Sequence, residues 1–247
     1  MTFELESFKN FTNALQEVSL LTNFASQCEQ NPNKYTALNK SALLLLTSKF
    51  EVFIEDVVRE YIEEINSMNI ANHLIPDQLK VKHSITRIKE IVDVIENPDK
   101  NDKKIKVFKE LAKLWADQEV NFDGLQIPNK FNYGTHGSKE MQKLFNNIEI
   151  ENIFETVVIY SENENSLLDE VQPIDFKAIF NNITGLRNAI THQDQTPNMT
   201  HKQIEGYAEN FHKFSKELCE YLEGRLFILN QEYKTYREVS SGRENIS

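Results

Sequence analysis

Three polar side chains stand close together near the end of an apolar stretch: Arg187, Asn188 and His192 in GLRNAITHQD, residues 185–194. If this stretch is a helix, a rotation of about 100° per residue places Arg187 inside the apolar arc formed by residues 176–190. Asn188 and His192 are four residues apart, so they lie on one side of the helix. A guanidinium binds phosphate through paired hydrogen bonds, and an imidazole exchanges a proton near neutral pH. This combination suits the cleavage of a phosphodiester.

A guanidinium placed among apolar side chains needs an anionic partner, because a desolvated and unpaired charge is strongly unfavourable. One possible partner is an incoming phosphate. The other is a carboxylate of the chain itself: Glu51 and Glu55 are four residues apart in a strongly amphipathic stretch, and either could pair with Arg187 if the two helices pack together. Thr191 extends the polar edge beside Arg187. The sequence leaves both alternatives open.

The elements that position these residues are predicted to be helices. Apolar side chains recur every three or four residues along most of the chain, and alternating patterns typical of strands are scarce. Ser138 is predicted to cap a short helix, and Trp115 is predicted to fill the core. The predicted helices span about 3–29, 37–66, 76–95, 105–116, 139–146, 173–192 and 200–233. We therefore expect an all-α helical bundle of six or seven helices with an irregular insert in the middle.

Composition agrees with one folded unit. The 247 residues are 40% hydrophobic and 26% charged, and they include only 7 glycines and 6 prolines. Such values are typical of a folded helical protein. We expect a single domain over 1–247, with a core at about 37–233, an insert at about 118–170 and a frayed tail at about 238–247.

The charge balance limits the possible partners. With 27 Lys and Arg against 38 Asp and Glu, the net charge is −11, which argues against unspecific coating of nucleic acid. The segment 80–113 is an exception, because it carries ten basic and six acidic residues. That segment is either a solvated helical face or a surface that faces phosphate.

Cysteine and histidine usage and hydropathy predict a cytoplasmic protein without a bound metal. Cys28 and Cys219 are far apart and are expected to be reduced thiols. The first residues lack the pattern of a secretory signal, and no apolar run is long enough to span a membrane. The six histidines lack the spacing of zinc ligands, so neither a metal nor another cofactor is expected.

The stretch 187–192 resembles the Arg-x4-His motif, with Asn after Arg, of the HEPN superfamily of helical ribonucleases. Two further segments support the likeness. SALLLLTSKFEVFIEDVVREYIEEI, residues 41–65, resembles the long helix of the prokaryotic stand-alone branch related to the RiboL-PSP-HEPN proteins, and residues 137–154 resemble the insert of those proteins. The resemblance covers most of residues 37–230.

This resemblance implies a homodimer in which two Arg-x4-His helices build one composite cleft. It implies a metal-independent endoribonuclease that uses the 2′-OH of RNA as nucleophile. His192 would then act as general base or acid, Arg187 would stabilise the charge at phosphorus, and Asn188 would orient the substrate or His192. The acidic chain favours a selective RNA substrate such as tRNA.

The resemblance also suggests a biological setting, either a toxin or an effector of anti-phage defence, with an antitoxin or a defence protein as a possible partner. Some toxin members carry a modifiable Tyr two residues after the His; here that position is Asp194, so such control is not expected. The alternative is a non-catalytic HEPN module that binds RNA, a nucleotide or a protein partner. In that case Arg187 would be a structural residue paired with Glu51 or Glu55.

Overall fold

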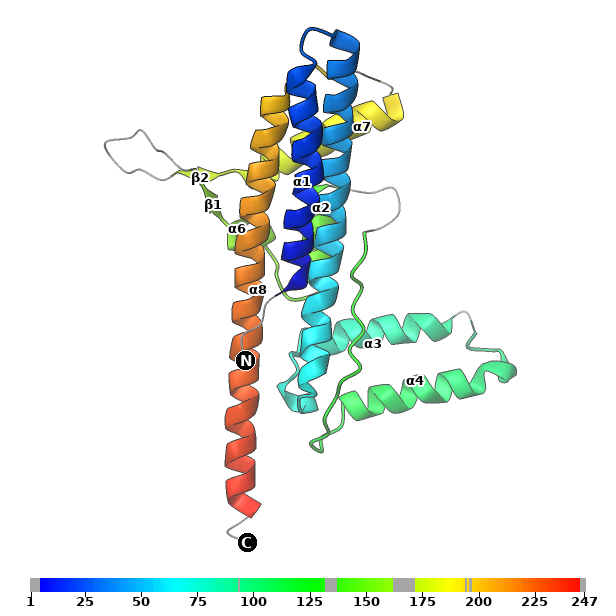
Figure 1. Cartoon of the computed structure of the whole chain (residues 1–247). Coiled ribbons are helices and arrows are strands. Elements are labelled where there is room, and N and C mark those ends of the chain that lie inside the picture. The colour runs from blue at the N-terminus through cyan, green and yellow to red at the C-terminus, as the bar shows by residue number, and fades with distance from the viewer. Residues whose placement is uncertain are drawn as a thin grey trace.

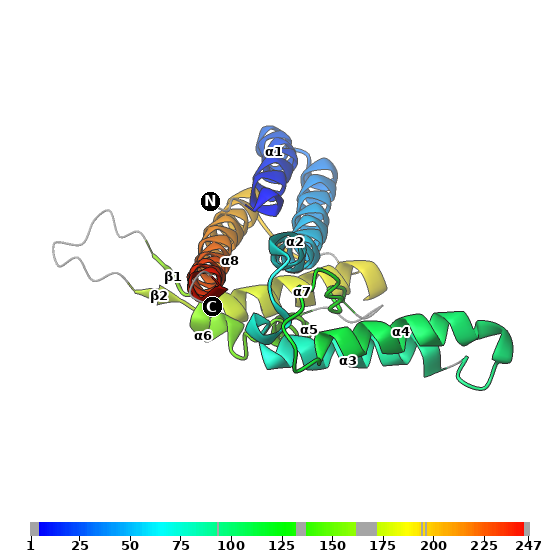
Figure 2. The ribbon, with the colours of Figure 1, turned by 90° about the horizontal axis from the view of Figure 1, so that it is seen from below.

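Three long helices packed side by side form the body of the protein. In the computed structural model, α1 (Glu6–Gln27), α2 (Pro32–Met68) and α8 (His201–Glu244) are in mutual contact (Figure 1, Figure 2). The structure describes residues 5–92, 94–131, 137–161, 172–193, 195 and 197–244, and side chains as far as residue 239. The sides of the helices that face one another carry the apolar stripes seen in the sequence, and their burial stabilises the fold.

Local sequence signals define both ends of α2. Its first residue is Pro32. Proline suits this position because it has no backbone N–H, and a backbone N–H in the first turn would have no partner within the helix. The side chain of Asn31 caps this end by accepting a hydrogen bond from the backbone N–H of Lys34 at 3.2 Å. At the other end Asn69 adopts a left-handed conformation, with φ of 47°, and stops the helix.

The helix α7 (Phe176–Gln193) crosses this body and is anchored by aromatic side chains (Figure 2). Phe176 stacks on Phe214 of α8, with ring centres 3.9 Å apart and planes inclined by 6°. Phe180 meets Phe50 of α2 edge-on, with ring centres 5.4 Å apart. These contacts fix the first half of α7, whose C-terminal end extends past α2 in both views.

A helical hairpin made of α3 (Asp77–Val92) and α4 (Asn101–Leu114) projects from the side of the body (Figure 1). Short 3-10 helices, η1 (Asn72–Leu74) and η2 (Pro98–Lys100), precede α3 and α4. Ala71 and Asn121 form an isolated antiparallel bridge at the base. The chain therefore enters and leaves the hairpin at the same point on the body.

Buried polar side chains tie the hairpin to the segment that follows it. The Asn72 side chain donates to the backbone oxygen of Ala116 at 2.8 Å and accepts from the backbone N–H of Val120 at 3.2 Å. His83 is fully buried, and its Nδ1 accepts a hydrogen bond from the backbone N–H of Gln126 at 2.9 Å. Burial lowers the pKa of His83, although the nearby carboxylate of Glu110 opposes this shift. Both the burial and the hydrogen bond to Nδ1 favour the neutral imidazole.

Short elements connect the hairpin to α7. They comprise the helices α5 (Ser138–Asn146) and α6 (Ile153–Thr156) and the strands β1 (Ile159–Tyr160) and β2 (Pro173–Ile174). The two strands are antiparallel, with Ile159 opposite Ile174 and Tyr160 opposite Pro173.

The predicted all-α class is confirmed, with eight α-helices in the described residues rather than six or seven. Several helix ends were predicted wrongly, among them the starts of α2 at Pro32 and of α4 at Asn101, each four or five residues earlier than predicted. Gly137, with φ of 122°, precedes α5, so Ser138 is the first helical residue and not the cap. Pro173 pairs with β1, so α7 begins three residues later than predicted, and α8 continues past Tyr233 to Glu244. Parts of the predicted insert (132–136, 162–170) and tail (245–247) lie outside the described residues.

The prediction for Trp115 was also wrong. Its side chain is 47% exposed and its indole N–H donates to Ser84 Oγ at 2.8 Å, because the outer face of the hairpin is not covered by another described element. Cys28 and Cys219 are both free thiols. Over the described part of the chain, no helix has the length and apolar character needed to cross a membrane.

Candidate active site

The second half of α7 carries the candidate residues on a helix whose first half is fixed in the core. Leu186 and Ile190 are half-buried and pack against the core. Arg187 lies between them in sequence and is also half-buried, as its place on the apolar arc predicts. His192 is exposed in the last turn of α7. The motif therefore lies where the helix emerges from the core.

The polar groups around Arg187 are few. Its Nη1 donates a hydrogen bond to Asn188 Oδ1 at 3.1 Å. Its backbone oxygen accepts a hydrogen bond from Thr191 Oγ1 at 2.9 Å, so the Thr191 hydroxyl is engaged by its own helix. Within the described residues, the Arg187 guanidinium makes no ion pair with a carboxylate. It thus retains unused donors that an anion could accept.

The two predicted internal partners of Arg187 lie on α2, which does contact α7. Both side chains are half-buried. Glu55 accepts a hydrogen bond from the backbone N–H of Phe131 at 2.8 Å, and Glu51 also has a contact of its own. Neither carboxylate is hydrogen-bonded or ion-paired to Arg187 in the residues that the structure describes. The packing of the two helices therefore does not neutralise Arg187 through Glu51 or Glu55.

Asn188 and His192 follow one another on one ridge of α7, as their spacing predicts. Arg187 and His192 are five residues apart, which corresponds to a rotation of about 140° and a rise of about 7.5 Å along the helix. The two side chains of one copy therefore leave α7 in different directions. Asp194, the residue at the position of the modifiable Tyr, lies outside the described residues.

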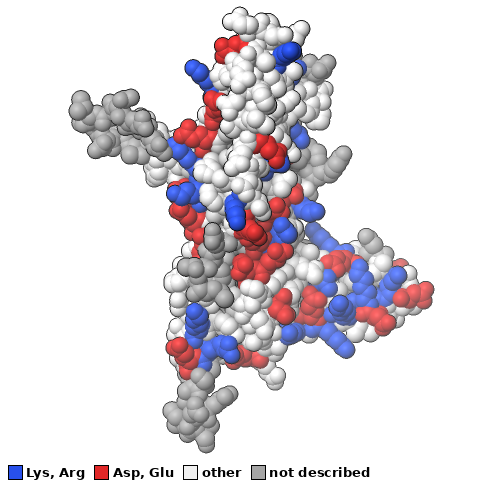
Figure 3. Space-filling view, in the orientation of Figure 1, with Lys and Arg blue, Asp and Glu red and all other residues white. Residues whose placement is uncertain are grey.

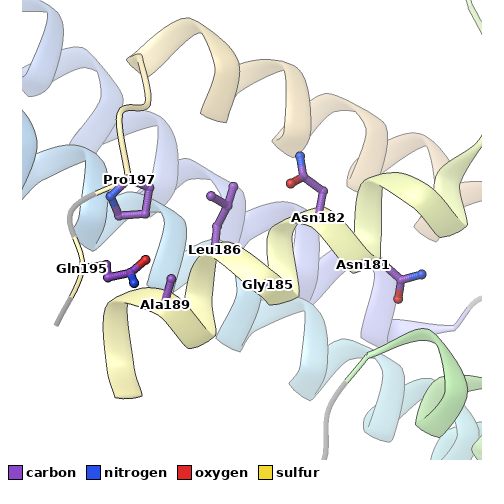
Figure 4. A pocket seen from close by; sticks show the side chains of 7 residues that line it. All are labelled: Asn181, Asn182, Gly185, Leu186, Ala189, Gln195 and Pro197. Atoms are coloured by element: carbon purple, nitrogen blue, oxygen red, sulfur yellow. The ribbon is translucent and has the colours of Figure 1, made fainter. Parts of the chain in front are cut away.

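Two pockets lie along α7 beside the motif. One, of about 360 Å³, is formed by the middle of α7 and the segment after it (Figure 4). The other, of about 350 Å³, lies between α7 and the start of α5. Asn181 and Gly185 line both pockets, and Asn188 lines the second. Neither pocket is lined by Arg187 or His192, so one copy of the chain does not enclose a complete site around these two side chains.

The start of α5 is held close to α7. The backbone N–H of Ser138 donates to Asn181 Oδ1 at 3.4 Å. A Cβ atom added to Gly137 would lie 3.7 Å from Thr184 Cγ2, and its φ of 122° is a conformation that only glycine adopts readily. Glycine at position 137 therefore allows the chain to enter α5 in close contact with α7.

The basic segment 80–113 forms the α3–α4 hairpin, and several of its cations have structural partners. Arg87, only 8% exposed, donates to Glu110 Oε2 at 3.0 Å and to Gln126 Oε1 at 3.1 Å. Lys104 donates to the backbone oxygens of residues 95 and 97. Lys and Arg alternate with Asp and Glu over the visible face of the hairpin (Figure 3). These features favour a solvated helical face over a continuous phosphate-binding surface.

Comparison with known proteins identifies the chain at the family level. The model of the RiboL-PSP-HEPN family matches residues 9–226, which include the candidate residues of α7. The chain belongs to the RiboL-PSP-HEPN family. Comparisons with curated proteins and with solved structures found no match.

Membership in the RiboL-PSP-HEPN family is compatible with a ribonuclease or a nucleotide-binding module. In this member Arg187, Asn188 and His192 lie together on α7, where His192 is exposed and the other two side chains are half-buried. Sequence reasoning missed Asn181 and Gly185, which line both pockets beside the motif. Their spacing of four residues, continued by Asn188, places them on the ridge of His192 and could have pointed to them.

Proposed function

We propose that this protein is a metal-independent endoribonuclease whose active site is built by the α7 helices of two copies of the chain. The observation that carries the proposal is the state of Arg187. It lies on a helix whose first half is anchored in the core, bonds through its side chain to Asn188, and has no carboxylate partner among the described residues. Such a guanidinium is prepared for an anionic group with two acceptor oxygens, such as a phosphodiester.

In the proposed reaction the 2′-OH of RNA attacks the adjacent phosphorus. A bond forms between O2′ and phosphorus, and the bond from phosphorus to the 5′ oxygen of the next nucleotide breaks. One His192 accepts the proton of the 2′-OH, and His192 of the second copy, in its protonated form, donates a proton to the leaving oxygen. Arg187 stabilises the negative charge that develops on the phosphorane oxygens, while Asn188 orients the guanidinium. The products are a 2′,3′-cyclic phosphate and a 5′-OH.

The direct test is cleavage of RNA by the purified protein in the presence of EDTA. We expect Arg187→Ala and His192→Ala each to reduce the cleavage rate by about 10²- to 10⁴-fold without changing the fold. Arg59→Ala and His73→Ala are matched controls, because both side chains are exposed and Arg59 pairs only with Asp56 and Glu63 on its own helix within the described residues. Normal cleavage by the His192 variant would refute the mechanism and would favour a non-catalytic RNA- or nucleotide-binding module.

A composite site makes a further prediction about mixed dimers. Because the proposed reaction uses His192 of both copies, a heterodimer of one wild-type copy and one His192→Ala copy should cleave RNA at far less than half the wild-type rate. Co-expression with two different affinity tags allows this heterodimer to be isolated. A heterodimer that retains half the wild-type rate or more would contradict a site that needs both histidines.

The biological setting that we propose is a toxin or an effector of anti-phage defence that acts on a selected RNA such as tRNA. Expression of the wild-type chain in bacteria should then arrest growth, and expression of His192→Ala should not. Sequencing of RNA ends that carry a 5′-OH in the arrested cells would identify the cleaved RNA.

A further inference from the structure

The pockets along α7 form a continuous series that leads away from the motif. The pocket between α7 and α5 shares Ser138 and Lys139 with a further pocket of about 290 Å³. On α7, the residues that line this series include Lys177, Asn181, Gly185 and Asn188. They are three or four residues apart, and His192 continues the same ridge. From Asn188 to Lys177 the ridge extends for about 16 Å.

The pocket at the far end of this series combines cations with an aromatic ring. It is lined by Lys139 and Lys143 of α5, by Lys177 of α7 and by Phe154 of α6. Phe154 is half-buried and its ring lies next to the core rings of Phe176 and Phe214, at centre distances of 6.4 and 6.3 Å. The core thus supports a ring that also borders the pocket, which we call the lysine pocket.

The three lysine side chains remain accessible. Lys143 pairs with Glu140 at 2.6 Å, yet its side chain is 68% exposed. Lys139 and Lys177 are exposed and have no ion pair with any described residue. In a chain of net charge −11, three lysines around one apolar pocket are a local departure from the overall charge.

A serine lies at the junction of the two pockets. Ser138 lines both of them and is 5% exposed as a residue. Its backbone N–H bonds to Asn181, whereas its Oγ makes no hydrogen bond with the described residues and is not one of the fully buried polar atoms. The hydroxyl is therefore available to bond to a ligand oxygen in the pocket.

The series of pockets along α7 ends where acidic side chains replace the lysines. The next pocket shares Phe154, Lys177 and Gln142 with the lysine pocket but is also lined by Glu155 and Asp175. Carboxylates at this point disfavour a further phosphate. The arrangement therefore accommodates phosphate around Ser138 and the lysines, and no farther.

We propose that the lysine pocket binds one nucleotide of a single-stranded RNA whose cleaved phosphate lies at the α7 motif. The base stacks on Phe154, and its phosphate is bound by Lys139, Lys143 and Lys177 and by the Ser138 hydroxyl. This inference rests on the proposed function for the location of the cleaved phosphate. It assigns the strand a path along the ridge of α7 and the start of α5. Base stacking on a ring beside a basic groove is how proteins bind single strands without strict sequence preference.

The test measures binding separately from cleavage. The probe is a fluorescein-labelled, mixed-sequence 2′-O-methyl oligoribonucleotide, which lacks the nucleophilic 2′-OH and cannot be cut by the proposed route. We compare the wild type with a triple Lys→Gln variant at positions 139, 143 and 177. The matched control replaces three exposed lysines of the hairpin, at positions 89, 106 and 109, in the same way. Fluorescence anisotropy at several salt concentrations gives affinity and salt dependence.

We expect the pocket variant to bind about tenfold more weakly at low salt, with a slope of log K against log salt that is smaller by about 0.7 for each phosphate that is no longer neutralised. The hairpin variant should bind within about twofold of the wild type. Phe154→Leu, which keeps an apolar side chain against the core, should weaken binding about fivefold or more because the base can no longer stack on a ring. Equal reductions in both lysine variants, or unchanged binding in the pocket and Phe154 variants, would overturn the proposal.

The same experiment separates this inference from the proposed function. A protein that binds the probe through the lysine pocket but does not cleave RNA would retain the binding site and refute the ribonuclease. A protein that cleaves RNA equally well with and without the three lysines would retain the ribonuclease and refute the binding site.

Discussion

Substitutions at Gly185 can separate the stability of α7 from its use as a binding surface. Gly185 is helical and exposed, and a Cβ atom added there would meet nothing within 4 Å. Alanine in a helix is more stable than glycine by about 0.5–1 kcal/mol, because its backbone has less entropy to lose on folding. For a chain of this size, 1 kcal/mol corresponds to about 2–4 °C in Tm. Gly185→Ala should therefore raise Tm by about 1–4 °C and leave RNA cleavage intact.

A large side chain at the same place should have a different effect. Gly185 lines both pockets beside the motif, so the ring of Gly185→Phe would occupy space that the proposed RNA path requires. We expect cleavage and binding of the 2′-O-methyl probe to fall about tenfold, equivalent to about 1.4 kcal/mol, while Tm stays near the wild-type value.

The assay compares differential scanning fluorimetry with the cleavage rate for each variant. Gly224→Phe on α8 is the matched control, since a Cβ atom there also meets nothing within 4 Å and the residue lines neither pocket beside the motif. It should change neither rate nor affinity. Full activity of Gly185→Phe would refute the proposed path, and a lower Tm for Gly185→Ala would refute the description of open space around this residue.

Three further predictions concern the parts of the fold that support the site. Because burial lowers the pKa of His83, the unfolded chain binds a proton at this residue more readily than the folded chain does. The free energy of unfolding should therefore fall as the pH drops below about 6.5. Urea unfolding of His83→Asn across the same pH range should lack this part of the pH dependence. Asn72→Ala would remove the side-chain partner of two half-buried backbone groups, and we expect a decrease of about 1–3 kcal/mol in the free energy of unfolding, with an unchanged m-value in urea. Gly137→Ala should cost about 1–3 kcal/mol through backbone strain and should weaken RNA binding with it; a neutral effect on Tm would contradict this account.

Helical periodicity was sufficient to predict the main elements and the setting of Arg187. The apolar stripe of α7 predicted both its buried face and a guanidinium beside that face, and the structure places Arg187 there. Helix ends were less predictable where distant contacts determine them. Pro173 pairs with Tyr160 of β1, and the sequence between these two residues shows no strand pattern. The residues next to Pro173 therefore gave no indication that it is extended.

The pockets could not be predicted, because they form between elements that are distant in the sequence. Ser138 and Asn181 are brought together only when α5 packs on α7. Trp115 shows the reverse case, since its size and apolarity favour burial but no other described element covers its side of the hairpin. Sequence patterns indicate which faces are apolar, and tertiary packing decides which of them are covered.

The bridge between Ala71 and Asn121 has a consequence for how this chain can vary. Residues paired in this way have Cα atoms about 4.5 Å apart, so the two ends of the α3–α4 excursion are held at a fixed spacing. The excursion also contributes Ile75, Leu79 and Leu114 to the core. Beyond these core residues the hairpin can change in length while α2 and the helix of the motif stay in register. Evolution can therefore alter what this arm contacts without disturbing the residues proposed to cut RNA.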